Sequence, residues 1–334
     1  MSELPNTLYM YNYNKNDGVT LGLDKCPVLK KDLRNGNAVN YDLKKNSENL
    51  SKRTHSDMTN STYESIIKYK ATIKSTNLRC DLGGADIVTW RGFLAKIYLI
   101  FCGKHKDKMC ILARRYNGVI FLENFTEKKT YEGLSIHMGH MYENYITEDA
   151  QGNPNDNKSV DTSDVNNIVQ TRVFKHNDKS TIVCYIAEND ARKSQGSKEF
   201  IEAKTHPGQI DKHFYTKKGH SLWIQSYLTN VDEIIVGLKK CDTPIPYIVE
   251  KNVFLKVEDI RQRNNIDAHE AMGSIAQVLI DTILATFSNP ETEFAEFTKP
   301  EKVKEFQSVV LSRTDERFST FFPEKFLAAY PKEN

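Results

Sequence analysis

The sequence lacks features that would place it at once in several large classes of protein. No apolar run is long enough to cross a bilayer, and no charged-then-apolar leader opens the chain. We therefore expect an intracellular, soluble protein with no membrane partner, and without a clear basic localisation cluster both nucleus and cytoplasm stay open. The 46 basic and 44 acidic residues give a net charge of only +2, so a nucleic-acid surface must be a local patch.

Two further absences concern metal and phosphate sites. The six cysteines show no C-x-x-C spacing, which argues against zinc and favours small core residues in a reducing compartment. The sequence also has no Gly-rich phosphate loop. Its 39% hydrophobic and 27% charged residues are ordinary for a globular protein. A chain of 334 residues can form one large α/β domain or two smaller ones.

Local patterns predict a mixture of helices and strands. Asn117-Gly118 separates two apolar runs and predicts a hairpin turn. Asp267 opens a helix that apolar spacing carries to about Phe287, and Glu270 stands at the capping-box position. The other elements we expect are an extended segment at Ile87–Trp90 and helices at Ser61–Ser75, Gly92–Phe101 and about Ser135–Glu148.

The segment Thr181–Thr205 is where we expect the chemistry. Two β-rich runs flank a polar, Gly-containing connector, which is typical of a hairpin. The first run is apolar on both faces, so it should be a central strand, and one face continues into Glu188 and Asp190. We expect Asp190 opposite Glu202 in the second run. In that register Glu188 faces Lys204, and four charged side chains converge on one patch.

Clustered carboxylates predict bound divalent cations. Three carboxylates with one ammonium repel one another in a low-dielectric pocket and need a counter-charge. Oxygen ligands favour Mg²⁺ or Mn²⁺ over zinc, and such ions activate water for attack on a phosphoryl group. An acid followed by Glu202-Ala203-Lys204 also resembles the core of PD-(D/E)XK nucleases. From the hairpin alone, a salt-bridged pair at a strand edge explains the pattern equally well.

Three polar residues in apolar segments elsewhere need partners. Arg91 stands between an extended segment and a buried helix, so it must meet either a nearby carboxylate, which its position favours, or a phosphate. Glu143 lies among apolar residues of a predicted helix, where a surface acid is the simplest interpretation. Gln225 lies in another apolar helix, where backbone contacts ordinarily satisfy such a side chain.

Taken in order, five motifs resemble the DXO/Rai family of decapping exoribonucleases and RNA 5′-end pyrophosphohydrolases. No single motif is decisive, whereas the order and the intervals of all five suit the family. They span about Asp86 to Lys240 and are Trp90-Arg91-Gly92, Gly139-His140-Met141-Tyr142-Glu143, Glu188-Asn189-Asp190, Glu202-Ala203-Lys204 and Gln225-Ser226-Tyr227-Leu228. Two positions depart from the family pattern, which usually has a hydrophobic residue at His140 and an aliphatic one at Asn189. They indicate a divergent, fungal member.

The resemblance implies both a fold and a set of site residues. The fold is α+β: residues 1–334 form a single domain with two mixed β-sheets flanked by helices and a PD-(D/E)XK-like core. Within it we expect a poorly defined N-terminal region at 1–60 and a surface loop at 149–167. The implied ligands of two Mg²⁺ or Mn²⁺ ions are Glu143, Glu188, Asp190, Glu202 and the carbonyl of Ala203. The implied catalytic residues are Glu188, Lys204 and Gln225, and the implied substrate contacts are Arg91, Lys204 and Gln225.

The resemblance also implies a metal-dependent hydrolase of RNA 5′ ends in RNA quality control. Its substrates would be RNAs with a capped, triphosphate or NAD 5′ end. It would remove incomplete or noncanonical caps, release pyrophosphate or degrade RNA in the 5′→3′ direction, and the sequence does not choose between these outcomes. Two alternatives stay open: a protein that binds and stabilises a larger 5′→3′ exoribonuclease, and a PD-(D/E)XK nuclease that acts on DNA.

Overall fold

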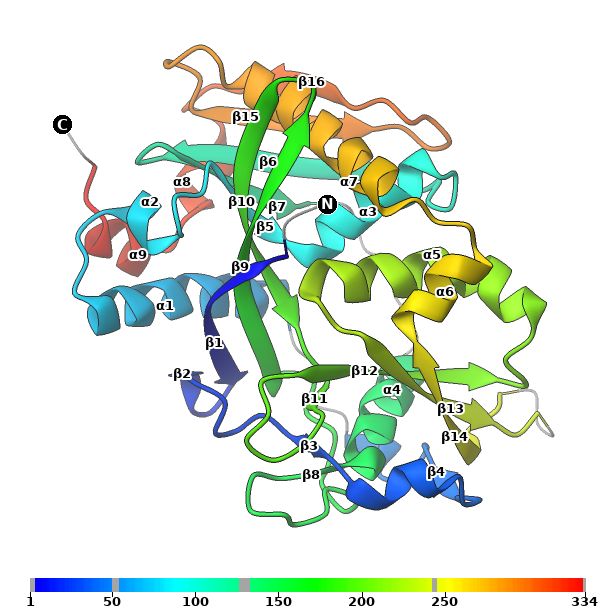
Figure 1. Cartoon of the computed structure of the whole chain (residues 1–334). Coiled ribbons are helices and arrows are strands. Elements are labelled where there is room, and N and C mark those ends of the chain that lie inside the picture. Colours follow the sequence, from blue (N-terminus) through cyan, green and yellow to red (C-terminus); the bar gives the residue numbers. More distant parts are fainter. Residues whose placement is uncertain (1–3, 50–53, 126–132, 242–244, 333–334) are drawn as a thin grey trace.

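Two mixed β-sheets form the frame of the protein (Figure 1). The computed structural model describes residues 4–49, 54–125, 133–241 and 245–332. Each sheet contains both parallel and antiparallel strand pairs, and helices cover the sheets. The predicted α+β fold with two mixed, helix-flanked sheets is therefore confirmed.

The larger sheet has nine strands and the smaller has seven. In spatial order the larger sheet contains β16 (Gln307–Val310), β15 (Phe294–Lys299), β6 (Met109–Tyr116), β7 (Val119–Asn124), β5 (Ile87–Trp90), β10 (Lys179–Glu188), β9 (Val165–His176), β1 (Asn6–Asn14) and β2 (Gly18–Leu21). The smaller sheet contains β4 (Tyr41–Asp42), β14 (Ile248–Lys256), β13 (Glu233–Lys239), β12 (Phe200–Pro207), β11 (Ala191–Arg192), β3 (Val28–Leu29) and β8 (Thr147–Glu148).

The helices connect and cover these strands. The α-helices are α1 (His55–Ile73), α2 (Leu78–Asp81), α3 (Arg91–Phe101), α4 (Gly133–Ile146), α5 (Lys212–Thr229), α6 (Val257–Arg263), α7 (Ala268–Gln277), α8 (Glu316–Thr320) and α9 (Glu324–Ala329). Two short 3₁₀ helices lie at Lys31–Asn35 and Ser47–Asn49, and α7 continues as a π-helix at Val278–Leu284.

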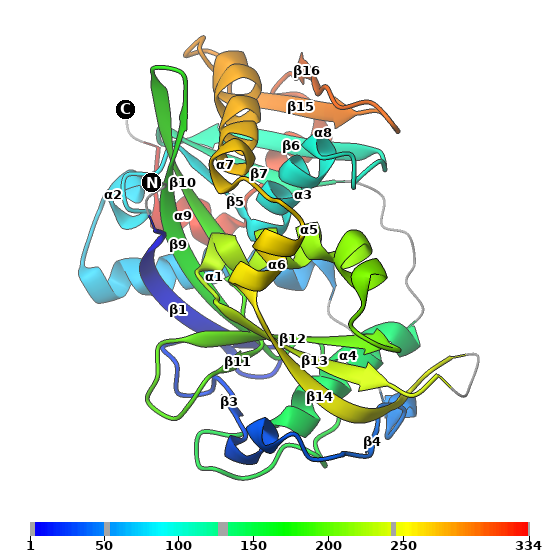
Figure 2. The same ribbon diagram turned by 45° about the vertical axis from the view of Figure 1, so that its right-hand side comes forward.

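Strand β10 is central in the larger sheet and covered on both faces, as its two apolar faces predict. Val183 and Tyr185 pack into the core that includes α3, α5 and α7, whereas Cys184 and Ile186 face the core that includes α1 and α9. Figure 2 shows α7 and α1 on opposite sides of this sheet. The end of β10 is therefore held rigidly from both sides.

Helix α5 connects the cores of the two sheets. Its Trp223 belongs to the same hydrophobic cluster as Tyr185 of the larger sheet and Ile234 of the smaller one. The other face of the smaller sheet packs against α4. There a Cβ on Gly237 would lie 2.5 Å from the ring of Tyr142. A glycine at this position lets α4 approach the sheet closely, which fixes the neighbouring Glu143.

Several elements form where local patterns predict them. Strand β5 and helix α3 match the extended segment and the buried helix, and α4 covers most of the predicted helix around Glu143. Asn117 and Gly118 have φ values of 44° and 77°, as the predicted hairpin turn requires. Asp267 caps α7 by accepting hydrogen bonds from the backbone N–H groups of His269 and Glu270.

The N-terminal region differs from the prediction because its partners are distant in sequence. Strand β1 lies between β2 and β9, and its Tyr9, Tyr11 and Tyr13 are buried. Helix α1 begins at His55 instead of Ser61, behind a capping box at Thr54. The predicted loop 149–167 ends earlier than expected, since its last three residues, 165–167, begin β9. The segment TLYMYNY, a possible edge strand by its sequence, is thus an inner strand that pairs on both sides.

The predicted hairpin at Thr181–Thr205 is wrong. Strands β10 and β12 lie in different sheets, and β10 pairs with β9 and β5. The connector contains a further strand, β11, and it is β11 that pairs with β12. Periodicity identifies a strand but not its partner, so two adjacent β-rich runs looked like one hairpin.

Among the described residues, no helix is long and apolar enough to cross a membrane.

A half-buried acid of the larger sheet is expected to make the stability of the protein depend on pH. Glu123 of β7 accepts a hydrogen bond of 2.8 Å from the hydroxyl of Tyr63. Burial raises the pKa of Glu123 from 4.5 to about 7, although this hydrogen bond opposes the rise. Between these two values the folded protein binds a proton that the unfolded chain has lost, so the free energy of unfolding falls as pH rises.

Replacing Glu123 by glutamine should remove this pH dependence, because glutamine does not ionise and can still accept from Tyr63. Relative to wild type, Glu123→Gln should gain stability by up to about 3 kcal/mol between about pH 4.5 and about pH 8. Urea denaturation of both proteins at the two pH values measures the difference. Parallel pH profiles would show that Glu123 ionises normally.

Candidate active site

The acidic residues lie where the chain passes from one sheet to the other. Glu188 ends β10 in the larger sheet, and β11 begins at Ala191 in the smaller one. Ala191 pairs with Ile201 across β11 and β12, so the same antiparallel register brings Asp190 next to Glu202, as predicted. The predicted opposition of Glu188 and Lys204 is wrong, because Glu188 pairs with Asn167 of β9.

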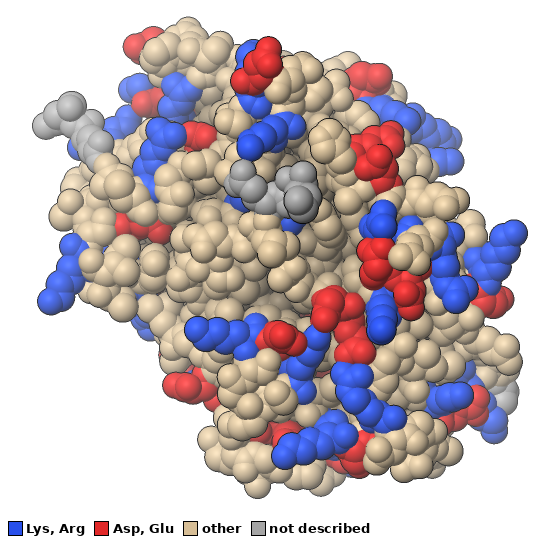
Figure 3. Space-filling model, viewed as in Figure 1, with Lys and Arg blue, Asp and Glu red and all other residues tan. Residues whose placement is uncertain are grey.

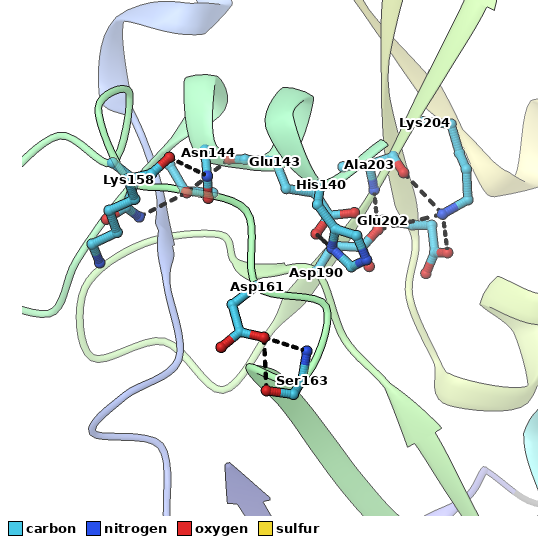
Figure 4. Close-up of polar contacts among 12 residues, drawn as sticks. His140, Glu143, Asn144, Lys158, Asp161, Ser163, Asp190, Glu202, Ala203 and Lys204 are labelled. Atoms are coloured by element: carbon cyan, nitrogen blue, oxygen red, sulfur yellow. Dashed lines mark hydrogen bonds and ion pairs between the residues drawn. The ribbon is translucent and has the colours of Figure 1, made fainter. Parts of the chain in front are cut away.

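The ammonium of Lys204 lies between the oxygens of three neighbouring residues (Figure 4). Its Nζ is 2.6 Å from Oε1 of Glu202 and 3.4 Å from Oδ2 of Asp190, and it donates a 2.9 Å hydrogen bond to the carbonyl of Ala203. The backbone N–H of Ala203 in turn donates to Asp190 at 2.6 Å. Two carboxylates and one carbonyl thus converge on a single cation.

Arg91 reaches this cluster from the larger sheet. Strand β5 runs parallel to β10 with Trp90 beside Ile186, and α3 begins at the next residue, so Arg91 emerges close to Glu188. Its Nη1 lies 3.5 Å from Oε2 of Glu202, and the two side chains are only 14% and 5% exposed. The carboxylate partner that the position of Arg91 favours is therefore present, and it comes from the other sheet.

Helix α4 contributes Glu143 and His140 to the same place. His140 Nδ1 lies 3.2 Å from Oε2 of Glu143, and both side chains point toward Asp190 (Figure 4). Together with Glu188 and Asp190 they line a polar cavity of about 120 Å³. Three of the predicted metal ligands, Glu143, Glu188 and Asp190, therefore share one cavity. Glu202 lies next to Asp190.

The charges in the cluster shift the pKa values of their neighbours. Burial raises the pKa of Asp190, and the charges of Glu202 and Glu143 raise it further. Burial works against ionisation of Glu202 as well, but the positive charges of Lys204 and Arg91 outweigh it and lower the pKa of this acid. Of these two acids, Asp190 thus holds a proton more tightly than Glu202 does.

The same acids stabilise the positive charges beside them. Burial opposes the charge on Lys204, but the carboxylates of Asp190 and Glu202 raise its pKa. Burial likewise lowers the pKa of His140, whereas the hydrogen bond to Glu143 and the charges of Glu143, Glu188 and Asp190 raise it to about 9. At neutral pH both side chains therefore carry a proton and offset the acids.

The donor set suits a hard divalent cation. Every predicted ligand offers an oxygen, as Mg²⁺ and Mn²⁺ prefer, and the oxygens of Asp190, Glu202 and Ala203 already contact one positive charge, that of Lys204. Within the described ranges, no group of three or more His, Cys, Asp or Glu side chains is already arranged to hold a metal ion. Lys204 and His140 contact carboxylate oxygens that a metal would take.

Among the described residues, the hydrogen bonds of Gln225 are to neighbours in its own helix. Gln225 of α5 donates to Ser221 Oγ at 3.3 Å, and its carbonyl accepts from Thr229. Its assignment to the scissile phosphate stays a prediction.

His140 is a residue of the site that the sequence analysis did not assign to it. The available signal was its spacing, since a histidine three residues before Glu143 lies on the same helix face.

A second cavity adjoins the acidic cluster. It has a volume of about 230 Å³, and its lining includes Arg91 and Glu188, whereas Trp90 and Ile111 make it largely apolar. Glu188 also lines the polar cavity, so the two cavities are neighbours.

The face in Figure 3 shows Lys and Arg interspersed with Asp and Glu, consistent with the small net charge of +2. This face therefore offers no broad surface of one charge, which is consistent with binding in the cavities.

An acid next to a Glu-x-Lys strand within a mixed sheet, flanked by helices, defines the PD-(D/E)XK class of nucleases. Within that class, the chain belongs to the RAI1 like PD-(D/E)XK nuclease family, whose model matches residues 3–327. The family expected from the five motifs is therefore confirmed.

Similar proteins support the same assignment. The chain is 31% identical over 196 residues to the decapping nuclease dom-3 of Caenorhabditis elegans, covering 54% of this chain and 48% of that protein. It thus spans about half the length of the curated relatives it matches. The fold is similar to that of Candida albicans Rai1, solved with pU5 and Mn²⁺, with a TM-score of 0.76, 15% identity and coverage of 99% and 96%. Scheffersomyces stipitis Rai1 with (3′-NADP)⁺ and calcium gives a TM-score of 0.74, 13% identity and coverage of 98% and 97%.

Proposed function

We propose that the protein is a divalent-metal-dependent hydrolase that acts on the 5′ ends of RNA. The observation that carries the proposal is the convergence of Asp190, Glu202 and the Ala203 carbonyl on the ammonium of Lys204. A buried set of oxygen donors around one cation is what a hard metal ion requires. Glu143 and Glu188 complete the set from α4 and from the end of β10.

Two ions, Mg²⁺ or Mn²⁺, would be held by Glu143, Asp190, Glu202 and the Ala203 carbonyl, with Glu188 holding the second ion or its water. Bound there, they would neutralise phosphate charge and lower the pKa of the attacking water. Lys204 must then leave the oxygens that it contacts. Its side chain is 37% exposed, so it can turn toward the cavity and donate to a phosphate oxygen that gains charge.

The remaining residues orient the substrate. Arg91 lies between the acids and the apolar cavity, where its guanidinium can bind the 5′-terminal phosphates as well as Glu202. Gln225 is proposed as a second donor to the scissile phosphate. The apolar cavity of about 230 Å³ can take a terminal base or nucleoside, which would place the adjoining phosphates over the acids. Arg91 thus fixes the depth at which a 5′ end enters.

The bound molecules in similar structures fit this substrate class. The Candida albicans protein holds pU5 with Mn²⁺, and the Scheffersomyces stipitis protein holds (3′-NADP)⁺ with calcium. Both ligands have phosphates attached to nucleosides. For this chain we propose RNAs with triphosphate, incompletely capped or NAD 5′ ends, from which it removes pyrophosphate or the cap before any 5′→3′ degradation.

A panel of 5′-labelled RNAs tests the proposal. Triphosphate, unmethylated-cap, methylated-cap, NAD and monophosphate ends are incubated with Mn²⁺, with Mg²⁺ and with chelator. We expect product from at least one modified end only when metal is present. DNA of equal length with a 5′-phosphate separates the two nuclease alternatives, since contacts to 2′-hydroxyls favour RNA. No metal-dependent product from any RNA would refute the proposal.

Arg91→Ala should change the recognition of 5′ ends more than the chemical step. Loss of a charge-assisted phosphate contact should raise KM by about tenfold or more, with a smaller effect on kcat, and flatten the preference among ends. Steady-state kinetics on two differently phosphorylated ends measure both constants. Arg91→Lys is the matched control, since it keeps the charge but not the fork of donors. If both variants only lower the melting temperature, Arg91 serves solely as the structural partner of Glu202.

A further inference from the structure

His140 adds a nitrogen donor to a site whose other donors are all oxygens. We propose that His140 is a direct metal ligand, and that it gives this protein a preference for Mn²⁺ and related transition-metal ions over Mg²⁺. The inference rests on the proposed metal-dependent function and goes beyond it, since it assigns the choice of metal to one residue.

The geometry of α4 allows His140 and Glu143 to bind the same ion. Residues three apart lie on one face of a helix, and here the Nδ1 and Oε2 atoms are 3.2 Å apart. Neighbouring ligands of an octahedral ion with bonds of about 2.1 Å are separated by about 3.0 Å. The distance between these two atoms therefore suits one shared ion, once the ring and the carboxylate turn to aim their lone pairs at it.

The position of the ring supports ligation over an ordinary surface contact. The side chain of His140 is only 24% exposed, and it lines the polar cavity together with Glu143, Glu188 and Asp190. Figure 4 shows the imidazole close to Glu143 and Asp190. Carboxylates from α4 and from the sheet junction thus surround a nitrogen that can accept a cation.

The chemistry of the ligand predicts the direction of selectivity. Imidazole nitrogen binds transition-metal ions well, whereas Mg²⁺ takes oxygen ligands and keeps much of its water. A site with one nitrogen among carboxylates therefore gains affinity for Mn²⁺ and gains much less for Mg²⁺. Other ions of the same series, such as Co²⁺, should benefit in the same way.

Metal binding to the full chain tests this assignment without any measurement of activity. Pulsed electron paramagnetic resonance of bound Mn²⁺ reports whether a nitrogen is coordinated directly, and displacement of Mn²⁺ by Mg²⁺ gives the ratio of the two affinities. We expect a nitrogen coupling in wild type that is lost in His140→Leu and His140→Gln. Both variants should lower the Mn²⁺-over-Mg²⁺ ratio by about tenfold or more.

The two variants separate ligation from positioning. Glutamine at position 140 can still donate a hydrogen bond to Glu143, so it would restore the wild-type ratio if His140 only positioned this acid. His213→Leu, at an exposed histidine of α5, is the matched control and should keep both coupling and ratio. The inference fails if wild type shows no directly bound nitrogen, or if His140→Gln keeps the ratio. If neither wild type nor any of these variants binds Mn²⁺, that result would instead refute the proposed metal-dependent function as well as the role of His140.

Discussion

Glu202→Gln is expected to lower kcat by at least about a thousandfold on every RNA end that wild type processes, because it removes a buried carboxylate from the centre of the proposed metal site. Glu202 is 5% exposed and contacts both Lys204 and Arg91. Glutamine has nearly the same shape but offers a weaker, neutral oxygen. Single-turnover kinetics with saturating Mn²⁺ measure the loss directly.

Two further variants show whether the loss of activity in Glu202→Gln comes from the proposed metal site. Asp190→Asn should be as inactive as Glu202→Gln, since both carboxylates belong to one donor set. Glu199→Gln is the control, because Glu199 is an exposed acid just before β12 that pairs with Lys193, and it should retain wild-type rates. Circular dichroism and melting curves confirm folding. Turnover within about tenfold of wild type in either core variant would remove the proposed mechanism.

Lys204→Met is expected to have opposite effects on catalysis and on metal binding. In the absence of metal the ammonium contacts Glu202, Asp190 and the Ala203 carbonyl, so a divalent cation must displace it. Without this competitor the affinity for Mn²⁺ should rise by about tenfold. The value of kcat should fall by about a hundredfold or more, because the developing phosphate charge loses its donor.

Calorimetric titration with Mn²⁺ and single-turnover kinetics on the same preparations test both halves of this prediction. Lys193→Met offers a control, since Lys193 pairs with Glu199 and Asp232 and not with the acidic cluster. Weaker Mn²⁺ binding in Lys204→Met would show that the ammonium supports the metal site and does not compete with it. An unchanged kcat would show that Lys204 has no role in the chemical step.

Local sequence carried much of the information about individual elements. The sequence pattern correctly predicted that Arg91 lies where β5 ends and α3 begins. It also correctly predicted the turn at Asn117-Gly118. Both signals depend only on neighbours in the chain. The order and the intervals of five short motifs were enough to indicate the family, although two of the motifs depart from its usual pattern. These residues determine local conformation or chemistry by themselves.

Partners distant in the chain could not be predicted in the same way. Strand β10 pairs with β5 and β9, not with the next β-rich run, and no local pattern distinguishes these possibilities. The register of Asp190 and Glu202 was right because β11 pairs with β12 inside the assumed connector. The position of α4, which brings His140 to the acids, depends on the packing of Tyr142 against Gly237.

The most direct test is an anomalous diffraction map from crystals of this protein soaked in Mn²⁺. The account predicts at least one Mn²⁺ peak within about 2.0–2.6 Å of carboxylate oxygens of Glu143, Asp190 and Glu202, with Lys204 displaced from between the acids. Mn²⁺ bound only elsewhere, with Lys204 still in contact with Asp190 and Glu202, would contradict it.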